Sequence, residues 1–145
     1  MAAKIVIDTS VLIKWVKTRD EELVKEARAL LAEVQRRPIK VHVPALLLYE
    51  AGNILVMKTR LEAVALDDAL SRVEDLPFSV APPASPLLKR AARLGRRFGI
   101  SFYDASFLAL AVEIDCPFVT ADRRLFDRAQ ALPRVRHLSR VGVLS

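Results

Sequence analysis

The sequence predicts a three-layer α/β/α domain with a central, mainly parallel sheet of about five strands. Short apolar segments rich in β-branched residues alternate with helical patterns along the chain. The first segments lack polar alternation, as expected of strands that are buried on both faces. A chain of 145 residues has the length of one domain, so we expect a single unit over residues 1–145.

The predicted strands are short and end next to polar or turn-forming residues. The first runs from Lys4 to Asp8, with Ile5-Val6-Ile7 as an uninterrupted apolar stretch. The others are expected at residues 41–43, 78–80, 117–120 and 135–138. Right-handed crossovers would bring the carboxyl ends of all these strands to one edge of the sheet. That edge is where open α/β sheets usually bind ligands.

The predicted helices follow from apolar periodicity and from residues that start or stop a helix. The clearest covers residues 21–37, because acids open it, Arg36 and Arg37 close it, and one face is apolar. Pro44 suits the first turn of the next helix, through Thr59, and Ser101 is expected to cap a nearly uncharged helix through Glu113. The remaining helices are expected at residues 10–16, 61–75, 87–98 and 122–131.

Charge and cysteine content narrow the class of protein. Lys and Arg number 23 against 17 Asp and Glu, a net charge of +6, which favours a polyanionic partner such as nucleic acid. Cys116 is the single cysteine, so it forms no internal disulfide and is expected to be buried. With no signal-peptide pattern and no apolar run of about 18 residues, we expect a cytoplasmic protein without a membrane partner.

Four carboxylates stand apart from the other charges of the chain. Three of them are the only formal charge in a long stretch of sequence: Asp8 in residues 5–13, Glu50 in residues 41–57 and Asp104 in residues 98–112. The fourth, Asp122, directly follows an apolar strand. Taken singly, three of them also fit turn or first-turn helix positions, whereas Glu50 lies mid-helix among leucines and fits none. We therefore interpret the four acids as one shared site.

Clustered carboxylates need a cation. Two carboxylates about 4 Å apart repel by roughly 4 kcal/mol at an effective dielectric constant near 20. A set of oxygen ligands favours hard ions such as Mg²⁺ or Mn²⁺. The sequence therefore predicts a divalent-metal site at Asp8, Glu50, Asp104 and Asp122.

These motifs resemble those of the PIN-domain nucleases. Residues 5–12 (IVIDTSVL) resemble the family's first strand, and residues 49–53 (YEAGN) its helix-borne Glu followed by Asn. Residues 102–105 (FYDA) and 119–122 (VTAD) are similar to its third acidic segment and its Thr-x-Asp element. The resemblance spans essentially the whole chain, and the compact length is most similar to VapC-type toxins.

The resemblance implies a fold, an activity and partners. It implies a PIN fold, a divalent-metal site and hydrolysis of RNA phosphodiester bonds, with the four acids as catalytic and metal-binding residues. It also implies a cognate antitoxin and a homodimer. A non-catalytic RNA- or protein-binding module, or an RNA-processing PIN nuclease unrelated to toxins, stays open. A dehalogenase-like phosphatase is disfavoured, because it needs a second Asp where Ser10 stands.

Other residues are predicted to support the site. Thr9, Ser10 and Thr120 could bind ligands or waters, and Asn53, one helical turn after Glu50, could orient that carboxylate. Arg96, Arg97 and Arg123 are predicted to bind RNA phosphates and to give binding a steep salt dependence. Trp15 fits either a protein interface or the core.

Overall fold

The computed structural model describes residues 3–140, 142 and 144, so residues 1–2, 141, 143 and 145 of the predicted domain lie outside it. Five strands form one sheet in the order β3-β2-β1-β4-β5. All four neighbouring pairs are parallel, which confirms the predicted sheet. The strands are β1 (Lys4–Ile7), β2 (Lys40–Pro44), β3 (Ser79–Ala81), β4 (Phe118–Thr120) and β5 (Val135–His137).

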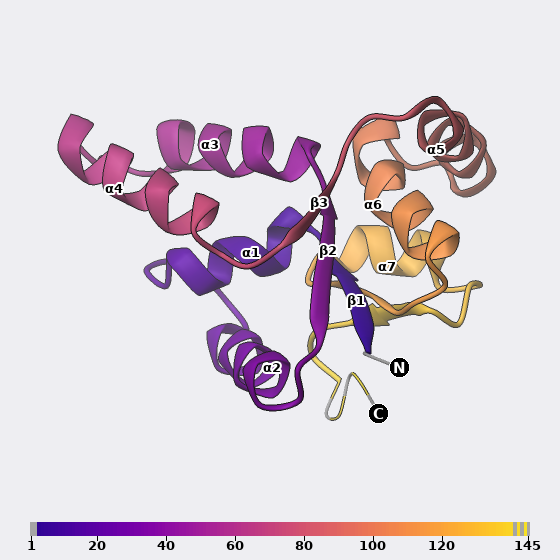
Figure 1. Cartoon of the computed structure of the whole chain (residues 1–145), viewed down its shortest axis with the longest axis horizontal. Helices are drawn as coiled ribbons and strands as arrows, with labels where there is room; N and C mark the ends of the chain where they lie inside the picture. Colours follow the sequence, from indigo (N-terminus) through magenta and orange to yellow (C-terminus); the bar gives the residue numbers. More distant parts are fainter. Residues whose placement is uncertain (1–2, 141, 143, 145) are drawn as a thin grey trace.

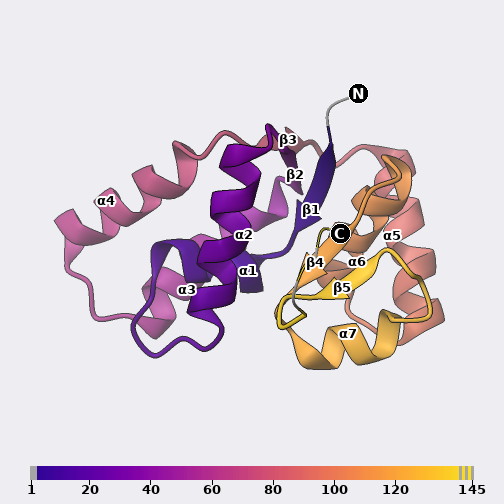
Figure 2. The same ribbon diagram turned by 90° about the horizontal axis from the view of Figure 1, so that it is seen from below.

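Helices cover both faces of this sheet and complete the three predicted layers (Figure 1). In both views, α1 to α4 lie on one side of β1 and α5 to α7 on the other (Figure 2). The helices are α1 (Thr9–Val16), α2 (Val24–Arg36), α3 (Leu46–Lys58), α4 (Ala63–Glu74), α5 (Ser85–Phe98), α6 (Phe102–Glu113) and α7 (Arg123–Ala129). In the described part of the chain, no helix combines the length and apolarity needed to cross a bilayer.

The core lies on both faces of β1, the central strand. Val6 and Ile7 are fully buried there, as are Phe118 and Val119 of the neighbouring β4. Helix α6 is buried over residues 105–111, because it packs on the sheet and also against α5. This explains why α6 is almost free of charge. Its two acids lie at its ends: Asp104 in the first turn and Glu113 at the last residue.

Most predicted element boundaries agree with the structure within two residues, but the start of the helix expected at 21–37 and the place of Pro44 are wrong. The helix expected at 21–37 begins at Val24, because Leu23 has a left-handed backbone (φ 57°) and Glu21 bonds back to Lys14 at 3.0 Å. Pro44 ends β2 and does not enter the helix that follows. It pairs with β3 alone at that point, so β2 is locally an edge, where a residue without an N–H is tolerated.

Trp15 packs inside the molecule. Its indole Nε1 donates to the carbonyl oxygen of Ala27 at 2.8 Å, and its ring lies 6.3 Å from that of Phe78. The side chain therefore fastens α1 to α2, which favours the core role of the two that the sequence left open. Cys116 is buried, as predicted.

Candidate active site

All four predicted acids lie at the carboxyl edge of the sheet. Asp8 directly follows β1, and Asp122 follows β4 by two residues. Glu50 lies in the second turn of α3, the helix that leaves β2, and Asp104 is the third residue of α6. Parallel strands with helical returns create this convergence, because every strand ends on the same side.

Asp8 is the most deeply buried of the four, with 5% of its surface exposed. It caps α1 and accepts hydrogen bonds at 2.5 Å from the hydroxyls of Ser10 and Thr120. Burial raises the pKa of Asp8 to about 7, and the negative charge of Asp104 adds to this rise while the two hydroxyls oppose it. A fixed, costly carboxylate of this kind is typical of functional sites.

The hydroxyls that hold Asp8 also bind the segment that follows β4. Ser10 Oγ accepts from the backbone N–H of Ala121 at 2.9 Å, and Thr120 Oγ1 accepts from that of Asp122 at 3.0 Å. Asp122 in turn caps α7, accepting from the N–H of Leu125 at 3.1 Å. Ser10 and Thr120 thus fix the positions of two acids at once, and the binding of ligands or waters predicted for them stays a prediction.

Glu50 is held by a residue that is distant in the sequence. Thr9 Oγ1 donates to Glu50 Oε1 at 2.7 Å, and burial raises the pKa of this carboxyl. Among the described residues, Asn53 makes no hydrogen bond to Glu50, although both line the same cavity. Thr9 of α1 therefore orients the carboxylate of Glu50, which is the role that the sequence analysis predicted for Asn53.

Asp104 interacts electrostatically with each of the other three acids. Burial raises its pKa, and the charge of Asp122 raises it further. The charge of Asp104 in turn raises the pKa of Asp8 and of Glu50. The N–H of Asp104 donates to Ser101 Oγ at 3.0 Å, which confirms the predicted N-cap of α6.

The donor set of this edge fits a hard cation. The four carboxylates and the neighbouring hydroxyls offer only oxygen, the ligand atom that Mg²⁺ and Mn²⁺ prefer. Three of the carboxyls have raised pKa values, so their joint ionisation needs positive charge nearby. Within residues 3–140, 142 and 144, however, no three Asp, Glu, His or Cys side chains form a ready-made metal-ligand cluster.

Two cavities flank the acids. One of about 310 Å³ lies on the Glu50 side and is lined by Thr9, Leu46, Tyr49, Glu50, Asn53, Ile54 and Tyr103. The other, of about 270 Å³, is lined by Gly99, Ile100, Ser101, Asp104, Asp122, Arg124, Leu125 and Arg128. The sequence interpretation missed Tyr49, Tyr103, Arg124 and Arg128 as parts of these walls. Their proximity to motif acids was the available signal.

The arginines singled out from the sequence lie elsewhere. Arg96 and Arg97 are exposed in the last turn of α5. Arg123 stacks on Phe126 at 5.5 Å and donates to Ser139 Oγ at 3.4 Å. None of the three lines the cavity beside Asp122, and their role in RNA binding stays a prediction.

His137, at the end of β5, is a supporting residue that the sequence did not reveal. Its Nδ1 accepts from the N–H of Ser139 at 3.2 Å, so Nε2 carries the proton and donates to the carbonyl oxygen of Ala121 at 3.2 Å. Burial lowers its pKa, and the charge of Arg123 lowers it further. A neutral His137 thus fixes the segment that leads into Asp122.

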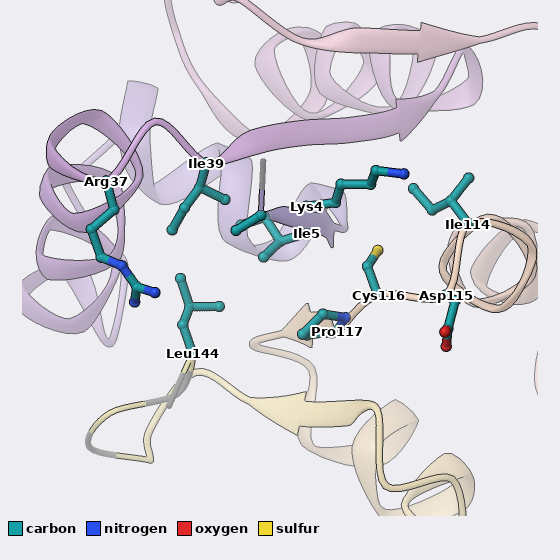
Figure 3. A pocket seen from close by; sticks show the side chains of 10 residues that line it. Lys4, Ile5, Arg37, Ile39, Ile114, Asp115, Cys116, Pro117 and Leu144 are labelled. Atoms are coloured by element: carbon teal, nitrogen blue, oxygen red, sulfur yellow. The ribbon is translucent and has the colours of Figure 1, made fainter. Parts of the chain in front are cut away.

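A larger cavity, of about 590 Å³, lies at the opposite, amino edge of the sheet (Figure 3). Ile5, Ile39, Ile114 and Leu144 give it an apolar lining. Cys116 also lines it, and burial raises the pKa of this thiol to about 11, so the thiol is neutral at ordinary pH. This cavity has the greater volume, but it holds neither the acids nor their hydroxyl partners.

Comparison with known proteins gives a consistent result. The PIN domain family model matches residues 5–132. Ribonuclease VapC3 of Pyrobaculum aerophilum is 29% identical over 133 residues, 89% of this chain and 97% of that protein. Ribonuclease VapC9 of Mycobacterium tuberculosis is 36% identical over 110 residues, 71% and 84% of the respective chains. A toxin–antitoxin complex from Klebsiella pneumoniae shares the fold, with a TM-score of 0.69, 17% identity and 94% and 98% coverage.

Proposed function

The chain belongs to the PIN-domain family, and we propose that it is a Mg²⁺- or Mn²⁺-dependent endoribonuclease, the toxin of a VapBC-type toxin–antitoxin pair. The observation that carries the proposal is the convergence of the four acids at the carboxyl edge of the sheet, where hydroxyl groups orient Asp8 and Glu50. The net charge of +6 and the ribonuclease relatives support RNA as the substrate.

In the proposed hydrolysis, the acids of this edge bind the metal ion and the hydroxyl groups orient the acids. Asp8, Glu50, Asp104 and Asp122 would hold the divalent ion through their carboxylate oxygens. When bound, the ion would lower the pKa of an attacking water and offset negative charge on the phosphoryl group. Ser10 and Thr120 keep Asp8 in one orientation through their hydroxyls, and Thr9 does the same for Glu50.

Protonation links metal binding to pH. Without a cation, Asp8 has a pKa of about 7 and is protonated in a large share of molecules near neutral pH. Binding of the ion requires its ionised form, so affinity should increase as pH rises through this value. We therefore expect cleavage at limiting Mg²⁺ to increase between about pH 6 and pH 8.

The decisive experiment is cleavage of end-labelled RNA by the purified chain. We expect products with Mg²⁺ or Mn²⁺, none with EDTA, and a large loss in Asp8→Asn. Asp115→Asn, a change at the opposite edge of the sheet, serves as the matched control and should cleave like wild type. Cleavage that persisted in EDTA would exclude the metal-dependent mechanism, and RNA binding without cleavage would favour a non-catalytic module.

The proposal also includes a cognate antitoxin, a homodimeric state and a cytoplasmic location. The VapC names of the relatives and the toxin–antitoxin complex of the same fold support the antitoxin. Expression of the chain alone should arrest growth, and expression together with the product of an adjacent antitoxin-like reading frame should restore it. Growth unaffected by an active nuclease would instead favour an RNA-processing enzyme.

A further inference from the structure

The two cavities that flank the acids differ in chemistry. The cavity on the Glu50 side is walled by two tyrosines, Tyr49 and Tyr103, whereas the one on the Asp122 side contains Arg124 and Arg128. A site that cuts a polymer must hold the chain on both sides of the cut. The difference between the walls therefore indicates which part of a nucleotide each side contacts.

The tyrosines are unusually exposed for residues of a cavity wall. Tyr49 is 79% exposed and Tyr103 is 60% exposed. They come from different helices, α3 and α6, so they do not belong to one apolar helix stripe. Both tyrosines line the same cavity as Glu50, so the two rings lie on the same side of the site as that acid. Exposed aromatic side chains are typical of surfaces that stack unpaired bases, and such surfaces bind the backbone through cationic side chains.

We propose that Tyr49 and Tyr103 bind an unpaired nucleobase next to the scissile phosphate, and that Arg124 and Arg128 bind backbone phosphate on the opposite side of the cut. This inference rests on the proposed ribonuclease function. It assigns a direction to the substrate, with base recognition on the Glu50 side and sequence-independent charge contact on the Asp122 side.

The arrangement selects against duplex RNA at this position. In a duplex, both faces of a base are covered by its stacked neighbours, and a flat tyrosine has no access to them. Extruding the base costs unstacking energy, least where the strand is already single. Tyr49 and Tyr103 would thus determine which phosphodiester bonds are cut, and the acids would cut them.

The test begins with wild-type protein and single-stranded RNA, whose cut positions are mapped from the product ends. Matched oligonucleotides then carry one abasic nucleotide on either side of the cut. We expect Tyr103→Ala and Tyr103→Leu to lower kcat/KM about tenfold and Tyr103→Phe to stay within twofold, because stacking needs the ring and not the hydroxyl. Met57→Ala, at an exposed α3 residue outside both cavities, is the control for loss of apolar surface.

The abasic substrates separate stacking from other effects of the substitution. The abasic change on the base-binding side should slow wild type about tenfold and add nothing in the double variant Tyr49→Ala/Tyr103→Ala, since no ring is then left to contact the base. The change on the other side should slow both proteins equally. Additive losses on both sides would overturn the inference.

Three further outcomes are decisive. Absence of any cleavage by wild type would overturn the proposed function and the inference with it. Cleavage that is unchanged in Tyr49→Ala and Tyr103→Ala would overturn the inference alone. A shift in oligomeric state of either variant, measured by sedimentation, would assign the tyrosines to contact between copies of the chain and would also overturn it.

Discussion

The two edges of the same sheet have opposite chemistry. The carboxyl edge carries four acids held by hydroxyls and helix N-termini, whereas the amino edge carries an apolar cavity that contains a neutral thiol. The cavity at the amino edge is the larger, at about 590 Å³ against about 310 Å³ and 270 Å³ beside the acids. Volume alone therefore does not locate the chemistry in this molecule.

The electrostatics of the two edges explain the difference. At the carboxyl edge, burial and mutual repulsion raise the pKa values of three acids, which is a cost that folding alone does not require. At the amino edge, the acid that lines the cavity, Asp115, pairs with Arg134 at 3.1 Å and has an ordinary structural explanation. Carboxyl groups with raised pKa values therefore indicate a functional site better than cavity volume does.

The largest expected effect comes from Asp104→Asn, compared with Asp115→Asn at the amino edge. Because Asp104 interacts with all three other acids, its loss should lower kcat/KM for RNA cleavage about 10³-fold, or roughly 4 kcal/mol. Asp115→Asn should change the rate less than twofold. Initial rates at saturating Mg²⁺ measure both, and equal losses in the two variants would remove the functional distinction between the edges.

A smaller effect is expected from Asp8→Asn, which should increase the stability of the metal-free protein. The folded-state pKa of Asp8 lies above its ordinary value of 3.8, so its ionisation destabilises the metal-free fold as pH rises from about 4 to about 7. Asp8→Asn removes that charge and should stabilise the metal-free protein by about 1–3 kcal/mol at pH 8 and by almost nothing at pH 4. Denaturant unfolding in EDTA at both pH values measures this.

Mg²⁺ provides the control for that result. It should stabilise wild type at pH 8 more than it stabilises Asp8→Asn, because the substitution removes one anionic ligand. If Asp8→Asn were as unstable as wild type at pH 8, ionised Asp8 would not destabilise the fold. If Mg²⁺ stabilised both proteins equally, Asp8 would not be a ligand of the ion.

A still smaller effect is expected from single arginines. Arg124→Gln should raise KM for RNA about three- to tenfold at moderate salt and reduce the slope of log affinity against log salt concentration by about one. Arg36→Gln, at the end of α2, is the matched control and should leave both unchanged. Arg96→Gln, Arg97→Gln and Arg123→Gln complete the series, and a larger loss in any of them would favour the arginines chosen from the sequence.

The smallest effect is expected at the amino edge. Cys116→Ala removes a buried sulfur and should cost about 1 kcal/mol of unfolding free energy, measured by denaturant titration, with RNA cleavage unchanged. A loss of cleavage larger than the loss of folded protein would mean that the amino edge contributes to function.

Several features were predictable from the sequence because their causes are local. Uninterrupted apolar strands, together with helices between them, predicted a parallel sheet and hence one edge for the strand ends. Asp8, Glu50 and Asp104 stood out as isolated charges, since a charge in an apolar stretch is costly without a role, and Asp122 stood out as an acid directly after an apolar strand. Ser101 was predictable as an N-cap because capping is also local and involves only the next three residues.

The tertiary structure decided what depends on distant partners. Thr9 and Glu50 are 41 residues apart, and periodicity carries no information about a hydrogen bond between their side chains. The starting point of α2 depended on the pairing of Glu21 with Lys14, and the place of Pro44 on its contact with β3. Which arginines and tyrosines wall the cavities depended on how α3, α6 and α7 pack around the sheet edge. Local sequence determines elements and their charges, whereas side-chain partnership across the fold is set by packing, which no short stretch of sequence contains.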